Sequence, residues 1–128
     1  MNRILALLML ALACSATPSQ VSEISQTALL AEPTSTLILD VRTAAEFASG
    51  HVPGAVNIPH DQLAARLSEV ESFRSAPVVV YCKSGRRAGM ATSVLADAGF
   101  SKLHHLTGDM NAWSQQGLPT EPANAPAP

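Results

Sequence analysis

A cysteine surrounded by basic residues is the feature of this sequence with the clearest chemistry. Cys82 follows the apolar run 78–81 and precedes a helical pattern over 88–98. Backbone N–H groups converge at such a strand-to-helix turn, and the following helix adds its positive dipole end. These surroundings favour the thiolate, so we expect Cys82 to be nucleophilic and to lie beside an anion-binding site. The basic residues around it are Lys83, Arg86 and Arg87.

The elements that position Cys82 are predicted from short apolar runs that alternate with helical patterns. Such runs are typical of strands buried on both faces, and their alternation with helices predicts an α/β domain. We expect a mostly parallel central sheet of about five strands with helices on both faces. The predicted strands are 21–24, 37–39, 55–58, 78–81 and 103–106. The predicted helices are 25–31, 43–48, 61–73 with an interruption near 68, 88–98 and 108–116.

Asp40 and Arg42 follow another predicted strand, 37–39. The carboxyl ends of parallel strands meet at one edge of a sheet, where ligands bind, so Asp40 and Cys82 should share that edge. Two interpretations of Asp40 and Arg42 stay open. Either Asp40 orients Arg87 while Arg42 adds to the field around an anion, or they form ion pairs or caps that fix the base of the loop. Glu46 is expected to pair with a basic side chain.

The histidines have no spacing typical of a metal site. His51 begins a turn with the sequence H-V-P-G, where it is either a general base or a turn histidine with satisfied hydrogen bonds. His60, His104 and His105 are expected at the surface or at a sheet edge.

Several motifs in this order resemble the rhodanese family of single-domain sulfurtransferases, and the resemblance extends over residues 21–119. Two departures stand out: Ala88 follows the loop arginine where the family often has serine, and Gly108-Asp109 replaces a common Gly-Gly pair. The motifs are D-V-R-T-A-A-E-F (40–47), G-H-V-P-G-A-V-N-I-P (50–59), V-V-V-Y-C-K-S-G-R-R-A (78–88), L-A-D-A-G-F (95–100) and L-T-G-D-M-N-A-W with G-L-P (106–119).

The resemblance implies a reaction. Cys82 would attack the outer sulfur of a donor such as thiosulfate, release sulfite and hold the sulfur as a persulfide until an acceptor takes it. The acceptor would be cyanide or a thiol, and no metal or organic cofactor is implied. The single domain implies a fairly open site. The residues of the cysteine loop (82–87) that would cradle the persulfide and the anion are Lys83, Ser84, Gly85, Arg86 and Arg87.

Three other activities use a reactive cysteine and are alternatives to sulfur transfer from thiosulfate. Cysteine phosphatases use C-x5-R, but the required position holds Ala88, so the loop is too short. A persulfide carrier that serves a partner protein with little turnover of its own remains the alternative. A thiol redox protein would lack a resolving cysteine, because the sequence has no C-x-x-C motif.

The N-terminal residues resemble an export signal. Arg3 supplies the positive start, and residues 4–13 are an apolar stretch too short for a stable membrane anchor. We expect a signal peptide over 1–13, cleaved before Cys14, or alternatively cleavage after Ala16. The first outcome would leave Cys14 lipidated and attached to a membrane, and the second would release a soluble protein. Both place the mature protein in the periplasm or outside the cell.

The remaining predictions concern the two ends of the chain and the binding partners of the protein. A tether (14–20) and a disordered Pro/Ala-rich tail (120–128) flank the domain. A disulfide between Cys14 and Cys82 is not expected, because it would consume the nucleophile. The formal net charge of -2, without a basic stripe, argues against nucleic acid as a partner. We expect a monomer that binds a small anionic sulfur donor and a thiol, cyanide or protein acceptor.

Overall fold

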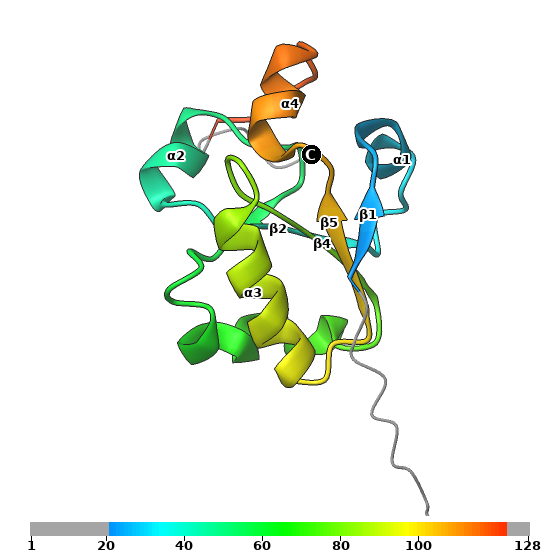
Figure 1. Ribbon diagram of the computed structural model, residues 1–128, viewed down its shortest axis with the longest axis vertical. Helices are drawn as coiled ribbons and strands as arrows, with labels where there is room; N and C mark the ends of the chain where they lie inside the picture. The colour runs from blue at the N-terminus through cyan, green and yellow to red at the C-terminus, as the bar shows by residue number, and fades with distance from the viewer. Residues whose placement is uncertain (1–20, 123–128) are drawn as a thin grey trace, which may run out of the picture.

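The computed structural model describes residues 21–122 and contains one parallel sheet with the strand order β1-β5-β4-β2-β3 (Figure 1). The predicted α/β class, with five parallel strands, is therefore confirmed. The strands are β1 (Ser22–Ile24), β2 (Leu37–Asp40), β3 (Val56–Asn57), β4 (Pro77–Tyr81) and β5 (Lys102–Leu106). The helices are α1 (Gln26–Leu30), α2 (Ala44–Ser49), the 3-10 helix η1 (Ala64–Phe73), α3 (Arg86–Asp97) and α4 (Asp109–Gln115).

Alternating side chains of the central strand β4 divide the core into two clusters, one on each face of the sheet. Val78 and Val80 pack with side chains of α3 and η1. Val79 and Tyr81 pack with side chains of α1 and α4, including the fully buried Trp113. Because each face is covered by helices, the central strand β4 is apolar throughout, as its sequence predicts.

The sequence also predicts the ends of α2 correctly. The Thr43 hydroxyl accepts a hydrogen bond from the Glu46 N–H, and the Glu46 carboxylate accepts one from the Thr43 N–H, which is a capping box. Gly50 ends the helix with a φ of 145°, a conformation that favours glycine. The capping box places Glu46 at a fixed position in the first turn of α2.

Two predicted elements differ from the structure. The segment expected as a helix from residue 61 is a 3-10 helix from Ala64, and its non-helical residue is Arg66 rather than a residue near 68. The strand expected over 55–58 is reduced to Val56–Asn57. This strand lies at the sheet edge and pairs only with β2, so less of the apolar run is held in a ladder.

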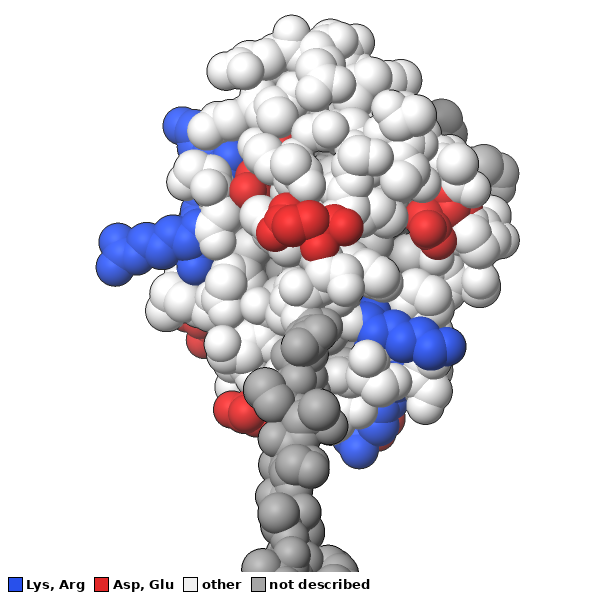
Figure 2. All heavy atoms as spheres, turned by 45° about the vertical axis from the view of Figure 1, so that its right-hand side comes forward, with Lys and Arg blue, Asp and Glu red and all other residues white. Residues whose placement is uncertain are grey.

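The predicted signal peptide, Cys14, the tether and the last six residues of the predicted tail lie outside the described residues. Within residues 21–122, no helix combines the length and the hydrophobicity needed to cross a bilayer. Basic side chains of the described residues form no continuous stripe on the face drawn in Figure 2.

Candidate functional site

The cysteine loop begins where β4 ends and leads directly into α3. The backbone N–H of Gly85 donates a hydrogen bond to the Cys82 Sγ at 3.0 Å. Gly85 has a φ of 113°, and a side-chain carbon at this position would lie 3.2 Å from Asp109 Oδ2. Both its conformation and this close approach favour glycine, so the loop needs Gly85 to direct its amide at the sulfur.

Burial of the sulfur corrects one prediction. Cys82 is only 1% exposed and contacts the apolar cluster beneath α3, so the expectation of a fairly open site is wrong for the sulfur itself. The chain closes around Sγ because the turn brings the Gly85 amide over it. Above the loop, a surface groove is lined by His60, Ser84, Arg86, Arg87 and Met90.

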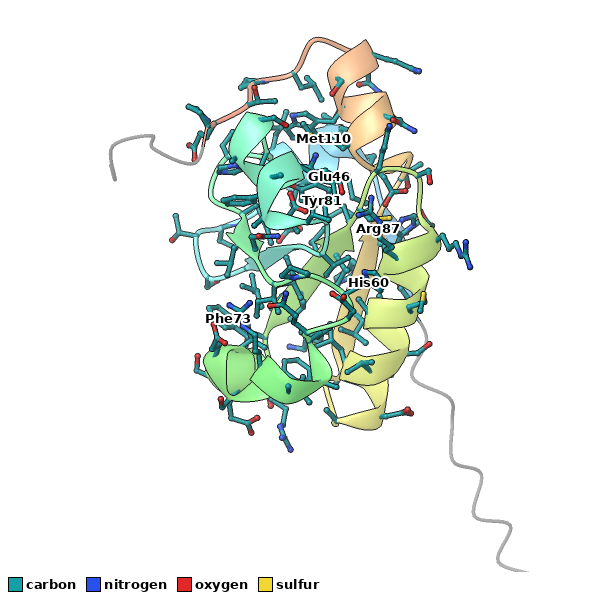
Figure 3. All side chains as sticks on the ribbon, turned by 90° about the vertical axis from the view of Figure 1, so that its left-hand side faces the viewer. Glu46, His60, Phe73, Tyr81, Arg87 and Met110 are labelled. Carbon is teal, nitrogen blue, oxygen red and sulfur yellow. The ribbon has the colours of Figure 1, made fainter. Side chains whose placement is uncertain are left out.

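The loop side chains divide into exposed and paired groups. Lys83, Ser84 and Arg86 are exposed, and within residues 21–122 neither Lys83 nor Arg86 forms an ion pair. Arg87 instead donates to both carboxylate oxygens of Glu46, at 2.7 and 3.1 Å. Figure 3 shows Glu46 and Arg87 on neighbouring elements, α2 and the start of α3.

The pairing of Glu46 with a basic side chain, predicted from the sequence, is confirmed. The hydrogen bonds from Arg87 are the largest cause that lowers the pKa of Glu46, to about 2. The same pairing compensates the positive charge of Arg87. An orienting contact between Asp40 and Arg87 was one of the two predicted roles of Asp40, but the side chain that holds Arg87 is Glu46.

Asp40 and Arg42 form a buried ion pair at the base of the site, with a shortest N···O distance of 2.7 Å. The Arg42 guanidinium also donates to the Gly50 carbonyl, and the Tyr81 hydroxyl donates to Asp40 Oδ2 at 2.7 Å. Burial and the Asp40 charge raise the pKa of Tyr81. Of the two predicted roles, this geometry matches the ion pair that fixes the base of the loop.

The hydrogen bonds of His51 are satisfied inside the turn. Its Nδ1 lies 2.9 Å from the Phe47 carbonyl, its ring stacks on Phe47 and the residue is 5% exposed. These contacts match the satisfied turn histidine, one of the two interpretations taken from the sequence.

The first turn of α4 holds both sides of the Cys82 residue from behind the loop. Asp109 Oδ1 accepts a hydrogen bond from the Cys82 N–H at 3.0 Å, and the Met110 N–H donates to the Cys82 carbonyl at 3.0 Å. Asp109 is 1% exposed, and it is the one non-glycine residue between 21 and 122 with a positive φ, 54°. The departure from the common Gly-Gly pair therefore places a carboxylate against the backbone of the cysteine.

His105 connects this carboxylate to the surface. Its Nε2 lies 3.0 Å from both Asp109 oxygens, and its Nδ1 lies 2.9 Å from Glu23 Oε1 on β1. The sequence predicted a surface or sheet-edge histidine and missed this cluster. Glu23 and His105 become neighbours only through the pairing of β1 with β5, which residue spacing does not show.

No group of three or more His, Cys, Asp or Glu side chains in the described part of the chain is arranged to hold a metal ion. The two nitrogens of His105 face different carboxylates, so its contacts form a chain of hydrogen bonds. The arrangement as a whole offers a cysteine sulfur, one amide directed at it and exposed cations beside it.

Comparison with known proteins agrees with this combination of fold and site. The sequence matches the Rhodanese-like domain family over residues 20–116. It is 38% identical over 90 residues to a protein named Sulfurtransferase from Allochromatium vinosum, covering 70% of this chain and 82% of that protein. It is 39% identical over 93 residues to Thiosulfate sulfurtransferase 16, chloroplastic, of Arabidopsis thaliana, covering 65% and 78%.

Among solved structures, a rhodanese-related protein from Thermoplasma volcanium superposes with a TM-score of 0.69 at 25% identity, covering 78% of this chain and 97% of that one. A parallel five-stranded α/β domain with a cysteine loop after its central strand is the class that fold and site define. The chain belongs to the rhodanese-like family. Its relatives named as sulfurtransferases support sulfur transfer as the general chemistry.

Proposed function

We propose that the protein is a thiosulfate sulfurtransferase that works through a persulfide on Cys82. The observation that carries this proposal is the Gly85 amide directed at Sγ within a loop that also presents exposed cations. The substrate would be thiosulfate or a similar donor of sulfane sulfur. The acceptor would be a thiophile such as cyanide or a thiol.

The reaction balances in two displacements. The Cys82 thiolate attacks the outer sulfur of thiosulfate, a new S–S bond forms, and the S–S bond of the donor breaks with its electron pair leaving on sulfite. The enzyme then holds a Cys82 persulfide anion. Attack by cyanide on the outer sulfur yields thiocyanate and returns the thiolate, so neither half requires an external oxidant or reductant.

The electrostatics of the loop support this chemistry. Thiosulfate and sulfite are dianions, and the exposed side chains of Lys83 and Arg86 lie next to the sulfur in sequence without a carboxylate partner among residues 21–122. Donors placed where charge develops stabilise a transition state, by about 3 kcal/mol for a single oxyanion-type donor. The Gly85 amide is such a donor, directed at the atom that carries the charge of the Cys82 thiolate before the attack and after the sulfur is released.

The burial of Cys82 favours a second candidate, a persulfide carrier that loads and unloads through partner proteins. Cys82 is 1% exposed, so a small donor reaches its sulfur only when the groups that cover this residue move. A partner protein that displaces them would act on the same residue. A carrier would form the persulfide stoichiometrically but would produce negligible thiocyanate from cyanide.

The mass of the protein after incubation with thiosulfate tests both candidates. The proposed enzyme gains one sulfur, about 32 Da, loses it to cyanide and repeats the cycle. The Cys82→Ser and Cys82→Ala variants should gain no sulfur and form no thiocyanate. Turnover that persists in these variants, or a wild-type protein that gains no mass, would refute the proposal.

The cations are tested separately with a matched control. Lys83→Ala and Arg86→Ala should each raise the KM for thiosulfate, because each removes one unpaired positive charge from the loop. Lys102 is an exposed lysine at the other end of β5, so Lys102→Ala removes the same charge away from the site. An equal rise of KM in all three variants would indicate a general charge effect and not a loop site.

We also propose that the protein is exported, with residues 1–13 removed. The support is the pattern of the first residues alone, a basic start and a short apolar stretch before Cys14. The N-terminal mass of the protein from its native host distinguishes the two outcomes, a lipidated Cys14 or a shorter unlipidated chain. An unprocessed N-terminus would refute export by this signal.

A further inference from the structure

The carboxylate of Asp109 is held in a strained position against the nucleophile. Its residue has a φ of 54°, its side chain is 1% exposed, and its Oδ1 accepts the Cys82 N–H at 3.0 Å. Residues other than glycine adopt this backbone conformation rarely, although aspartate does so more often than most. This strained conformation places the Asp109 carboxylate in contact with the Cys82 amide.

The neighbouring His105 balances this buried charge. Both of its ring nitrogens face carboxylate oxygens, Nε2 those of Asp109 and Nδ1 that of Glu23. An imidazole donates from both nitrogens only when it is doubly protonated. Burial disfavours the charged ring, but the hydrogen bonds to Glu23 and Asp109 outweigh it and raise the pKa of His105.

No other charged group faces this ring among residues 21–122. Glu23 comes from β1, Asp109 from the start of α4, and β4 presents Val80 as the register neighbour of His105. Thr107, beside Glu23, is uncharged and donates its hydroxyl to that carboxylate. The loop and α3 line the adjoining groove with Gly85, Ala88, Gly89 and Thr92.

The charge of His105 therefore changes the electrostatic potential at the cysteine loop. Asp109 Oδ2 lies 3.2 Å from the position of a Cβ on Gly85, so the carboxylate packs directly behind the amide that faces Sγ. With His105 protonated, the His105–Asp109 pair is neutral. When the ring loses its proton, a net negative charge remains behind the loop and opposes any anion in front of it.

We propose that Asp109 is a positioning residue for the cysteine loop and that the proton on His105 sets the affinity of the loop for its anionic donor. This proposal rests on the proposed sulfurtransferase function, because it names a control on the binding step of that reaction. One unit charge at about 10 Å from a dianion such as thiosulfate, in an effective dielectric of about 20 to 40, changes the affinity roughly 15- to 300-fold. The KM for thiosulfate should rise by a factor of this order as His105 deprotonates.

The test is the pH dependence of KM and kcat in the wild-type protein and three variants. In the wild type, KM should rise with pH while thiosulfate stays ionised throughout. His105→Gln leaves the Asp109 carboxylate uncompensated, so its KM should be high and free of this rise. Asp109→Asn keeps an oxygen for the Cys82 amide without the charge, so its KM should stay low across the range.

Glu23→Gln is the variant least at risk of unfolding, since the Glu23 side chain is 62% exposed. It removes one of the two carboxylates that hold the proton on His105, so the rise of KM should move to lower pH. A titration of the His105 ring by NMR should show its pKa displaced downward in Glu23→Gln and in Asp109→Asn, because each removes a carboxylate that raises it.

The outcomes separate this inference from the proposed function. A wild-type protein that gains no sulfur on Cys82 at any pH refutes the sulfurtransferase. A wild-type protein that loads sulfur normally, but whose KM does not change with pH, refutes the control by His105. An identical rise of KM in His105→Gln refutes it as well, because the titrating group would then be another one.

Discussion

The ion pair between Glu46 and Arg87 provides the sharpest test of how the loop is held. Its geometry indicates that Arg87 acts by fixing the start of α3 to α2 rather than by binding the donor alone. The matched variants are Glu46→Gln and Arg87→Gln, with their combination. Gln is suited to both positions, because at 46 it preserves the capping box with Thr43 and at 87 it retains most of the aliphatic stem.

The expected magnitude follows from the exposure of the pair. The side chains of Arg87 and Glu46 are 24% and 31% exposed, and two hydrogen bonds of 2.7 and 3.1 Å join them. Exposed pairs contribute up to about 1 kcal/mol, and bidentate geometry places this pair near that limit. About 1 kcal/mol corresponds to roughly a fivefold change in an equilibrium or rate.

Each single variant should therefore lose about fivefold in kcat/KM for thiosulfate. The double variant should lose about the same fivefold, because either single change already removes the shared interaction. Steady-state kinetics with thiosulfate and cyanide give the four values, and urea unfolding of the same proteins shows whether the coupling also appears in the free energy of unfolding.

Two results would refute this reasoning. If Arg87 serves only as a ligand for the donor, then Glu46→Gln frees its charge and lowers the KM for thiosulfate. If the two side chains act independently, the losses multiply and the double variant falls about 25-fold.

Two further predictions concern stability. Tyr81→Phe removes the hydroxyl that donates to Asp40 and accepts the Val52 N–H, so urea unfolding should show a loss of about 1 to 3 kcal/mol, and a change within about 0.5 kcal/mol would contradict it. The pKa of Glu46 is lowered by Arg87 to about 2, so its contribution to stability is complete above an ordinary glutamate value of about 4.5 and is lost as the pH falls toward 2. Acid unfolding of Glu46→Gln should lack that part of the pH dependence, and an unchanged curve would contradict it.

The sequence predicts those features of the fold that depend on local patterns. Continuous apolar runs such as 78–81 identify strands buried on both faces, and the pattern over 43–48 identifies the helix α2. The strand-to-helix turn after residue 81 places a cysteine at the edge of the sheet where ligands bind. These predictions succeed because the interactions involved lie within a few residues of one another.

The partners of the charged side chains are harder to predict, because they depend on which strands become neighbours. Glu23 and His105 are separated by 82 residues and meet only through the parallel register of β1 with β5. Glu46 and Arg87 meet across the top of β2 and β4, 41 residues apart. The charge of a side chain shows whether its partner is an acid or a base. Only the order of the strands determines which acid or base that partner is.

The burial of Cys82 is a consequence of the same long-range packing. The sequence places a reactive cysteine on a loop, where side chains are usually exposed. The first turn of α4 binds the Cys82 carbonyl and N–H from behind, while the Gly85 amide closes over the sulfur from the other side. The two contacts from α4 cannot be inferred without knowing that α4 returns to the end of β4.

The distribution of charge around the loop then determines which side chains attract the donor. Glu46 compensates Arg87, and His105 in its protonated form compensates Asp109. Lys83 and Arg86 are the loop cations left without an ion pair within residues 21–122, so the long-range attraction for a dianion should come mainly from them. Loss of Lys83 or Arg86 should therefore raise the KM for thiosulfate more than it lowers kcat. Loss of Arg87 should lower kcat as well, because it removes the ion pair with Glu46 that fixes the loop. Salt should weaken the effect of losing Lys83 or Arg86 more than the effect of losing Arg87. Exposed charges are screened by salt, whereas a bidentate, partly buried ion pair is screened less.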